Sequence, residues 1–351
     1  MSGRPKIFGH LMADVIRKGR CVGCGACSAV CPVNSIELEE GTPRLVGLCI
    51  ACGMCYNNCP QTEFDVGEME RRVFGRERTE DEAETGVMRA CYAVRAREEE
   101  TLERCQDGGA VTAILFQFLA DGGDCAVVAG LEEERPWSPK PVVATSKEEV
   151  LKGAGTKYTP SPSILGVDSA VYEYDRDRVA VVGTPCQMRA LRRIEAGDHS
   201  EAKIGKAVAL NIGLFCMETF GYPSFMDFLK EEGVDASAVT KFDIKKGRFI
   251  AWRDGEAIYD VKLSKVKEIV RPCCGRCDDF AAEFSDLSIG NVGSPDGWST
   301  VIVRTERGEA ALRSAEKGGL IEVQPLDDVK PGLSMVIRLA GTKKKGAKKG
   351  G

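Results

Sequence analysis

Residues 21–60 contain one cysteine pattern twice. Each copy has the spacing C-x2-C-x2-C-x3-C-P, and the second copy begins 28 residues after the first, at Cys49 instead of Cys21. The cysteines of the two copies are Cys21, Cys24, Cys27, Cys31, Cys49, Cys52, Cys55 and Cys59. Free thiolates this closely spaced are ligands for soft metals or iron–sulfur clusters. The duplicated pattern therefore predicts a metal-bearing module near the start of the chain.

The spacing is that of two-cluster bacterial ferredoxins, in which the fourth cysteine of each run binds the other 4Fe–4S cluster. A structural zinc site, the alternative, needs four ligands in paired C-x2-C knuckles and matches eight cysteines in a doubled run poorly. We expect a bacterial-type 2x4Fe–4S ferredoxin module over residues 1–65. The crossed ligation assigns one cluster to Cys21, Cys24, Cys27 and Cys59, and the other to Cys31, Cys49, Cys52 and Cys55.

Composition limits the remaining possibilities. A length of 351 residues allows two or three domains, and a net charge of -5 gives no sign of a nucleic-acid partner. The longest apolar run, Val111 to Ala120, is half the roughly 20 residues that a membrane-spanning helix needs. Sixteen cysteines without an export signal indicate free thiols, so we expect a cytoplasmic chain without a transmembrane segment. The two histidines, His10 and His199, exclude a histidine-based metal site or triad.

The rest of the chain divides by composition. Residues 66–86 are strongly charged and predict a solvated linker or an exposed helix. Residues 87–339 alternate β-branched runs with helical patterns, which predicts a mixed, mainly parallel α/β domain. The expected strands are Met88–Ala96, Cys125–Ala129, Val142–Thr145, Val179–Val182, Ala207–Ile212 and Leu287–Asn291, with an antiparallel insertion over Phe242–Val261. The expected helices are Ala110–Ala120, Lys147–Leu151, Gln187–Ile194, Ser224–Glu231 and Arg307–Glu316. The lysine- and glycine-rich residues 340–351 predict a disordered tail.

A second set of cysteines lies in this α/β domain. Cys186 and Cys216 each follow an apolar strand, where ligands gather in parallel sheets, and Cys274 and Cys277 form a C-x2-C. These four thiols can meet around a cofactor, or they can be buried structural thiols beside an adventitious C-x2-C. Cys273 can replace Cys274 as a ligand. Neither alternative is excluded by the spacing.

Three loops are candidate sites for a phosphate or a flat ring. Gly108 and Gly109 lie at the start of a predicted helix that contains Thr112. The free N–H groups of the first helical turn suit a diphosphate. A plain helix cap explains the two glycines equally well. Lys157 and Tyr158 lie in a polar loop with a single cation. The last loop is glycine-rich and follows a strand, so it is either a ring-binding loop or a surface turn; its candidate residues are Gly293, Ser294, Gly297 and Trp298.

Taken together, these segments resemble the family formed by the beta subunits of coenzyme F420 hydrogenases and dehydrogenases. With its two-cluster ferredoxin module, the chain is most similar to the F subunit of archaeal F420H2 dehydrogenase. The segments that carry the resemblance are Gly-Gly-Ala-Val-Thr-Ala (108–113), Gly-Thr-Lys-Tyr (155–158), Val-Gly-Thr-Pro-Cys-Gln (182–187), Gly-Leu-Phe-Cys (213–216), Cys-Gly-Arg-Cys-Asp-Asp-Phe (274–280) and Gly-Ser-Pro-Asp-Gly-Trp (293–298).

The resemblance implies a flavin domain over residues 87–339 that holds FAD and a third 4Fe–4S cluster. It assigns that cluster to Cys186, Cys216, Cys274 and Cys277. The implied activity is oxidation of reduced coenzyme F420 by hydride transfer to FAD, followed by single-electron transfer through three 4Fe–4S clusters.

The electrons would pass to other subunits of a redox complex, either a membrane F420H2 dehydrogenase or a soluble acceptor. Peripheral attachment to the cytoplasmic face of a membrane through a partner is therefore an open alternative. The chemistry belongs to the cofactors, so no catalytic side chain is named. Basic groups are expected near the anionic F420; the candidates are Lys157, Arg189, Arg192 and Arg193, for each of which a solvated surface charge is the alternative.

Two other functions remain open. One is a non-catalytic iron–sulfur adaptor that only transfers electrons. The other is a ferredoxin-dependent reductase of the same family that acts on another substrate. Bound flavin and oxidation of reduced F420 distinguish these alternatives.

Overall fold

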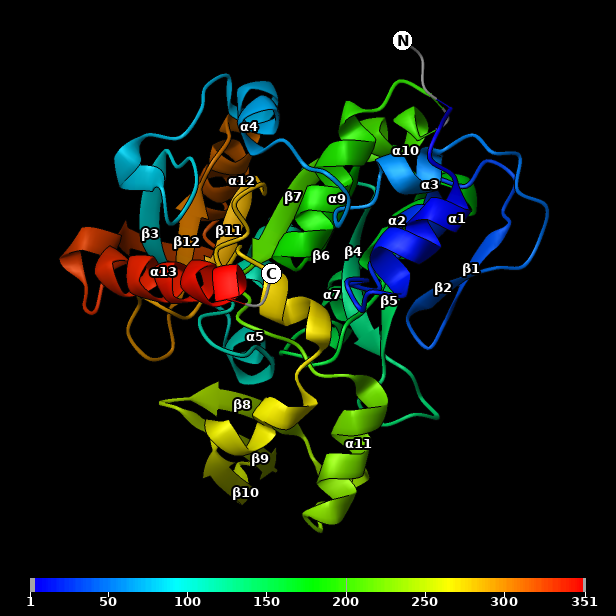
Figure 1. Ribbon diagram of the computed structural model, residues 1–351. Helices are drawn as coiled ribbons and strands as arrows, with labels where there is room; N and C mark the ends of the chain where they lie inside the picture. The colour runs from blue at the N-terminus through cyan, green and yellow to red at the C-terminus, as the bar shows by residue number, and fades with distance from the viewer. Residues whose placement is uncertain (1–3, 200, 350–351) are drawn as a thin grey trace.

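The computed structural model describes residues 4–199 and 201–349 (Figure 1). Its N-terminal module, residues 4–65, repeats one local structure at the two cysteine runs. Helix α2 and helix α3 each begin after a glycine with positive φ, Gly25 at +87° and Gly53 at +82°. Only glycine adopts this conformation without strain, so the sequence repeat becomes a structural repeat. The module's elements are α1 (Phe8–Leu11), a π-helical turn (Met12–Ile16), α2 (Ala26–Ala29), β1 (Ile36–Glu39), β2 (Thr42–Leu45) and α3 (Met54–Asn57).

The charged segment 66–86, predicted to be a solvated linker or an exposed helix, contains a partly exposed helix that packs against the protein, so the linker alternative is wrong. Helix α4 (Val66–Phe74) and a 3-10 turn (Glu80–Glu82) bury Glu70 and Glu82. Arg78 bridges Glu70 at 2.5 Å and Glu283 at 2.7 Å. These ion pairs offset the cost of burying the carboxylates, which composition alone does not reveal.

The body of the protein, residues 87–349, is built on one mixed sheet with the order β13-β3-β12-β11-β7-β6-β4-β5. The predicted mixed α/β fold is confirmed, but parallel pairing is limited to the central strands β11, β7, β6 and β4. The expectation of a mainly parallel sheet needs this correction, because the outer strands pair antiparallel. The strands are β3 (Ala90–Ala96), β4 (Cys125–Leu131), β5 (Pro139–Ala144), β6 (Val179–Gly183), β7 (Val208–Leu214), β11 (Leu287–Gly290), β12 (Ser299–Val303) and β13 (Ile321–Pro325).

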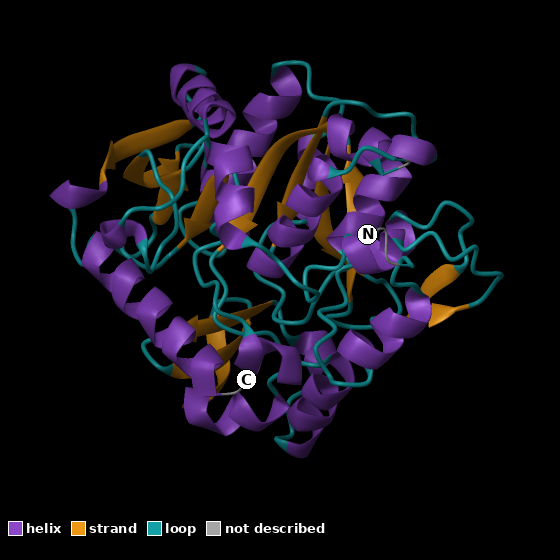
Figure 2. Ribbon diagram, turned by 45° about the horizontal axis from the view of Figure 1, so that its top comes forward, coloured by secondary structure: helices purple, strands orange, loops and turns teal. Residues whose placement is uncertain are grey.

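Helices cover both faces of this sheet (Figure 2). Alternate residues of β4 point to opposite faces: Val127 packs in the cluster under α8 and α9, whereas Ala126 and Val128 pack in the cluster under α6 and α12. A strand that is buried on both faces has a continuous apolar sequence. The apolar runs therefore predicted the central strands of the sheet. The helices are α5 (Glu99–Arg104), α6 (Ala110–Ala120), α7 (Lys147–Lys152), α8 (Ser163–Tyr172), α9 (Pro185–Ala196), α10 (Ala202–Ala207) and α12 (Glu306–Lys317).

The predicted antiparallel insertion is confirmed as a three-stranded meander with its own core. Strands β8 (Lys241–Lys245), β9 (Arg248–Arg253) and β10 (Glu256–Lys262) pack with α11 (Tyr222–Glu231), below the large sheet in Figure 1. Phe225, Phe242 and Phe249 are fully buried between them. Short 3-10 turns cover Ala236–Ala238, Leu263–Ile269, Pro272–Arg276 and Leu326–Asp328.

The predicted disordered tail is wrong as far as Lys349, because residues Leu333–Lys349 form helix α13. Val336 and Ala340 are fully buried against Phe280 and Ile302. The segment is rich in lysine, but Val336 and Ala340 recur at helical spacing and form an apolar stripe. This stripe packs on the body and holds the lysine-rich turns in place. Residues 350 and 351 of the predicted tail lie outside the described residues.

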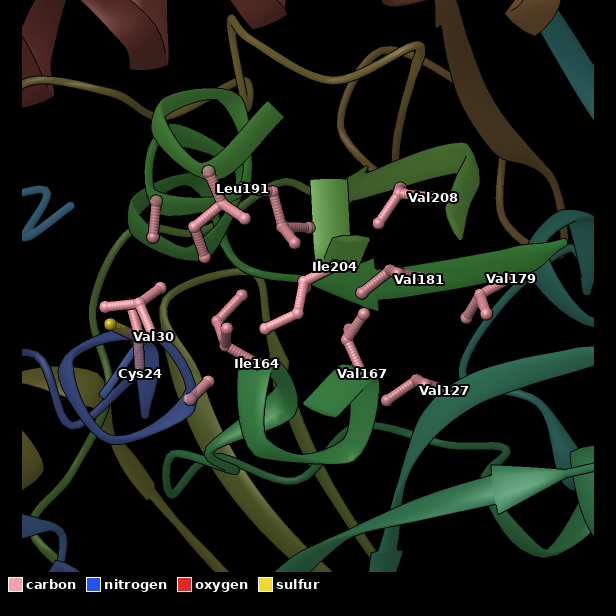
Figure 3. Close-up of a cluster of buried hydrophobic side chains, with 14 of the residues drawn as sticks. Cys24, Val30, Val127, Ile164, Val167, Val179, Val181, Leu191, Ile204 and Val208 are labelled. Atoms are coloured by element: carbon pink, nitrogen blue, oxygen red, sulfur yellow. The ribbon is translucent and has the colours of Figure 1, made fainter. Parts of the chain in front are cut away.

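The N-terminal module packs directly on the body. Cys24 and Val30 of the module share an apolar cluster with Ile164 of α8 and Leu191 of α9 (Figure 3). Ile164 also donates a backbone hydrogen bond to the carbonyl of Cys24 at 3.3 Å. This contact fixes the first cysteine loop against the sheet.

Two arginines of the body hold the module by its backbone carbonyls. Arg193 of α9 donates to the carbonyls of Asn57 at 2.9 Å and Cys59 at 2.6 Å. Arg271 donates to the carbonyls of Val22 at 3.0 Å and Cys21 at 3.2 Å. Charge-assisted bonds of this kind are roughly twice as strong as neutral ones.

Replacing Arg193 by methionine should loosen the module from the body. The substitution removes the donor for the carbonyls of Asn57, Cys59 and Glu63 and for the hydroxyl of Thr62. The expected cost is about 1.5–3 kcal/mol. Limited proteolysis of the anaerobically prepared protein should release the module faster than in the wild type. Arg313→Met, which removes an exposed cation on α12, is the matched control. Equal proteolysis rates in both variants would contradict this account of the contact.

Candidate functional site

The parallel strands bring Cys186 and Cys216 to the same edge of the sheet. Gly183 of β6 and Gly213 of β7 are register partners, and each cysteine lies three residues further along the chain. The two thiols therefore leave the carboxyl-terminal edge at neighbouring points. This is the edge where open α/β sheets bind ligands.

The C-x2-C loop is held at this edge by backbone pairing. Phe220 and Val270 form an antiparallel bridge, and Arg271 donates its N–H to the carbonyl of Thr219 at 3.0 Å. The N–H of Cys216 bonds the carbonyl of Phe280 at 2.9 Å. These contacts place the segments on either side of the C-x2-C beside Cys216.

The four body cysteines interact electrostatically. Burial raises the pKa of the Cys216 thiol, with further contributions from Cys274, Cys186 and Cys277. Burial also raises the pKa of Cys277 to about 11. Ionising such thiols requires a positive charge or a metal nearby. The four predicted ligands thus lie within electrostatic range of one another at this edge of the sheet.

A buried lysine accompanies these thiols. Lys343 of α13 is 6% exposed and donates to the carbonyl of Met217. Burial alone would lower the pKa of Lys343, but Cys277, Cys216 and Cys274 raise it above its ordinary value. Sequence reasoning missed this residue because it assigned the segment to a tail. The signal was present in the spacing of Val336, Ala340 and Lys343, which places them on one helix face.

Cys273 and Cys274 have different environments. The adjacent thiols of Cys273 and Cys274 influence each other, which lowers the pKa of Cys274 and raises that of Cys273. The N–H of Thr219 also donates to the sulfur of Cys274 at 3.4 Å. Cys273 is buried in the apolar cluster that contains Cys24. Cys274 is therefore the better candidate ligand of the pair.

In the N-terminal module, each predicted ligand set lines a separate apolar cavity. The first cavity is lined by Cys21, Cys24, Cys27 and Cys59; we call this set the inner cysteines. The second is lined by Cys31, Cys49, Cys52 and Cys55; we call this set the outer cysteines. In each cavity the fourth cysteine of one run joins the first three of the other.

These groups do not suit a single metal ion. Within residues 4–199 and 201–349, no three His, Cys, Asp or Glu side chains converge closely enough to hold one ion. Zinc requires sulfurs about 2.3 Å from the metal, whereas the cysteines here surround a cavity. A multi-iron cluster fits this arrangement, because its cysteines bind separate iron atoms.

The inner cysteines lie between the body cysteines and the outer cysteines. Cys24 shares an apolar cluster with Cys273, and Cys186 and Cys274 pack against that cluster. The charge of Arg271 influences the thiols of Cys21, Cys186 and Cys273. On the other side, Cys27 interacts electrostatically with Cys55 of the outer set. The cysteines thus form a continuous series from the sheet edge to the surface.

Two of the candidate phosphate and ring loops reach the same edge of the sheet. Gly109 precedes α6 in the left-handed conformation, and Gly108 lies so close to Ser299 and Val94 that a side chain there would collide with backbone. Thr112 of α6 contacts the thiol of Cys105 at 3.2 Å. In the other loop, Gly297 has open space beside it, whereas Gly293 packs near Thr300.

Three of the remaining predicted contact residues, Ser294, Lys157 and Tyr158, have hydrogen-bond partners within the protein. Ser294 bonds Thr300 at 2.7 Å, and Trp298 is half-buried next to β12. Lys157 donates to the carbonyls of Gly153, Ala154 and Gly155 at 2.7–3.2 Å. The Tyr158 hydroxyl accepts the N–H of Ile244 at 2.9 Å, and its ring packs in the meander core. Lys157 and Tyr158 therefore support their own loops.

The arginines proposed as F420 contacts have internal partners, so the alternative of solvated surface charges is wrong for them. Arg189 pairs with Asp278 at 2.7 Å, and Arg192 pairs with Asp286 at 2.8 Å. Arg193 binds the N-terminal module, as described above. Cations that sequence reasoning missed lie on β8: Lys241 donates to the carbonyl of Gln106 at 3.1 Å, and Lys245 pairs with Asp296 at 3.0 Å. They bring positive charge to the two glycine loops.

Three groups of cysteines arranged in series beside an α/β sheet define an iron–sulfur electron-transfer protein. Comparison with protein families agrees: a 4Fe-4S dicluster domain matches residues 13–60. The coenzyme F420 hydrogenase/dehydrogenase beta subunit matches in two parts, its N-terminal part over residues 91–165 and its C-terminal part over residues 176–329. The chain belongs to the family of coenzyme F420 hydrogenase/dehydrogenase beta subunits, which confirms the resemblance seen in the sequence.

Two relatives share most of their length with this chain, and a third shares half of its length. Coenzyme F420 hydrogenase subunit beta of Methanosarcina barkeri is 37% identical over 72% of this chain and 87% of its own length. The F subunit of the F(420)H(2) dehydrogenase of Methanosarcina mazei is 32% identical over 95% of this chain and 92% of its own length. Coenzyme F420-dependent sulfite reductase of Methanocaldococcus jannaschii, a longer protein, is 35% identical over 90% of this chain and 50% of its own length.

A solved structure shares the fold. A chain of the F420-reducing [NiFe] hydrogenase complex from Methanosarcina barkeri has a TM-score of 0.73 and 36% identity. The likeness covers 76% of this chain and 92% of that chain. Among the described residues of the present chain, no helix has the length and apolar character to cross a membrane.

Replacing Lys157 by glutamine should destabilise the loop over residues 153–158 without weakening the binding of FAD, the cofactor that the resemblance implies. The ammonium holds three carbonyls, so we expect a loss of about 1.5–3 kcal/mol in the free energy of unfolding. Lys152→Gln, at an exposed position of α7, is the control. Thermal unfolding and titration with FAD measure the two effects. Reduced affinity for FAD with an unchanged unfolding midpoint would show that Lys157 is a phosphate contact after all.

Proposed function

We propose that this chain oxidises reduced coenzyme F420 by hydride transfer to FAD and passes single electrons through three 4Fe–4S clusters to a partner in a redox complex. The observation that carries the proposal is the series of cysteine groups that begins at the ligand-binding edge of the sheet and ends at the protein surface. The relatives that share this fold are named for reactions of coenzyme F420.

The cofactors supply the exchange between hydride and single electrons, and the protein positions them. Cys186, Cys216, Cys274 and Cys277 are the proposed ligands of the body cluster. The inner and outer cysteines are the proposed ligands of the two ferredoxin clusters.

The N-terminal turn of α6 and the loop over residues 293–298 are proposed to hold FAD. Unpaired N–H groups at a helix start suit a diphosphate. The open space beside Gly297 suits the approach of a flat group. Lys241 and Lys245 are proposed to attract the anionic groups of F420, because they lie on the adjoining meander.

The body cluster can be tested by comparing substitutions of Cys216 and Cys273. Cys216→Ser should lower the iron content from about twelve to about eight atoms per chain. Oxidation of reduced F420 with benzyl viologen as the acceptor should fall at least tenfold. Cys273→Ser is the control, because it alters a buried thiol in the same region and should keep both iron and activity. If wild-type protein with its full iron and flavin leaves reduced F420 unoxidised, the adaptor function is favoured.

The charge of Lys343 should raise the reduction potential of the body cluster. A buried cation stabilises the more negative, reduced form, on the order of 1.4 kcal/mol or ~59 mV for one electron. Lys343→Met should therefore shift the midpoint potential of one cluster to a more negative value in an EPR-monitored titration. Lys345→Met alters an exposed lysine of the same helix and should leave all potentials unchanged. Identical potentials in the two variants would contradict a role for Lys343.

A further inference from the structure

Large apolar side chains are exposed mainly in one region. Among the described residues, Leu48 is 87% exposed and Ile50 is 58% exposed. Neighbouring exposed side chains complete a surface that we call the outer patch; its members are Val33, Leu45, Val46, Leu48 and Ile50. Exposed apolar groups gathered in one place indicate an interaction surface.

The outer patch surrounds the outer cysteines. Val33, Leu45 and Ile50 line the same cavity as these cysteines. Cys49 and Cys52 are themselves exposed, whereas Cys24, Cys27 and Cys59 of the inner set are buried. The patch therefore surrounds Cys49 and Cys52, which are more exposed than the other proposed ligands in the described residues.

The outward position of these side chains is fixed by hydrogen bonds. The hydroxyl of Ser35 donates to the carbonyl of Leu48 at 2.9 Å, and the N–H of Val46 donates to the carbonyl of Ser35 at 2.9 Å. Ser35 also donates its N–H to the sulfur of Cys31 at 3.4 Å. Through Ser35, the backbone of residues 46–48 is bonded next to Cys31, a proposed cluster ligand. The backbone is therefore held in a position from which the apolar side chains face outward.

Charges are confined to the rim of the patch. Residues 45–56 contain no charged side chain. At the rim, Arg44 pairs with Glu39 at 2.5 Å, and Arg135 pairs with Glu40 at 3.1 Å. An apolar centre with a polar rim is the arrangement of protein–protein interfaces. Anionic lipid surfaces attract clusters of unpaired lysine and arginine instead, and both rim arginines are paired.

We propose that the outer patch is the docking surface for a separate protein that carries a one-electron redox centre beneath an apolar face of its own. This inference rests on the proposed function, since it requires a cluster at the outer cysteines. In the transfer, one electron leaves the reduced outer cluster and reduces the partner's centre by one electron. No covalent bond or proton changes place. Electron-transfer complexes are commonly small and short-lived, which suits a patch of this size.

The test uses holoprotein reduced with dithionite and freed of excess reductant, so it does not depend on F420 or flavin. Its oxidation is followed by stopped flow with two acceptors, an oxidised two-cluster bacterial ferredoxin as the protein probe and benzyl viologen as the small dye. The variant Leu48→Glu/Ile50→Glu should react at least tenfold more slowly with the ferredoxin and equally fast with the dye. The control variant Tyr172→Glu/Tyr174→Glu, which alters other exposed large side chains, should match the wild type with both acceptors.

Equal rates of ferredoxin reduction in the patch variant and the wild type would overturn the proposal. If the patch variant loses iron, Leu48→Ala/Ile50→Ala removes the same side chains without adding charge and decides the question by the same two rates. Light scattering of the wild type and of the patch variant, each without an acceptor, tests whether a second copy of this chain binds the outer patch. A wild-type dimer that the patch variant converts to monomer would also overturn the proposal. Failure to oxidise F420 would affect only the proposed function, because the electrons here come from dithionite.

Discussion

The contact between the first cysteine loop and the segment that carries the C-x2-C is the interaction on which the proposed electron path depends. Cys24 and Cys273 share one apolar cluster, and Arg271 reaches across to the carbonyls of Cys21 and Val22. Without this contact, the module and the sheet would each hold cofactors that are not connected. With this contact, the N-terminal module and the body share one continuous series of cysteines.

Desolvation then determines the chemistry of these groups. The neighbouring Cys273 and Thr219 lower the pKa of Cys274. Burial, in contrast, raises the pKa values of Cys24, Cys27, Cys216 and Cys277 above those of thiols in water. Such thiols are poor nucleophiles and retain their protons until a metal displaces them. Cationic groups at Lys343 and Arg271 supply the positive charge that negatively charged clusters need in an apolar setting. In the outer set, Cys49 and Cys52 are exposed to solvent.

Much of this arrangement could be predicted from the sequence, because its signals are local. The doubled cysteine run fixed the crossed sets that line the two cavities, and apolar runs fixed the strands whose ends carry Cys186 and Cys216. The failures depended on tertiary contacts. Glu70 is buried because Arg78 lies opposite, and Lys343 is buried because Ala340 and Val336 anchor its helix. Likewise, Lys157 looked like a free cation until its carbonyl partners were known.

The most direct test of the account is the cofactor content of the protein purified without oxygen. Iron, acid-labile sulfide and flavin should be measured on the same preparation. The account predicts about twelve iron atoms, about twelve sulfides and one FAD per chain, for three 4Fe–4S clusters and one flavin. A preparation with about eight iron atoms and no flavin, stable to further reconstitution, would contradict it.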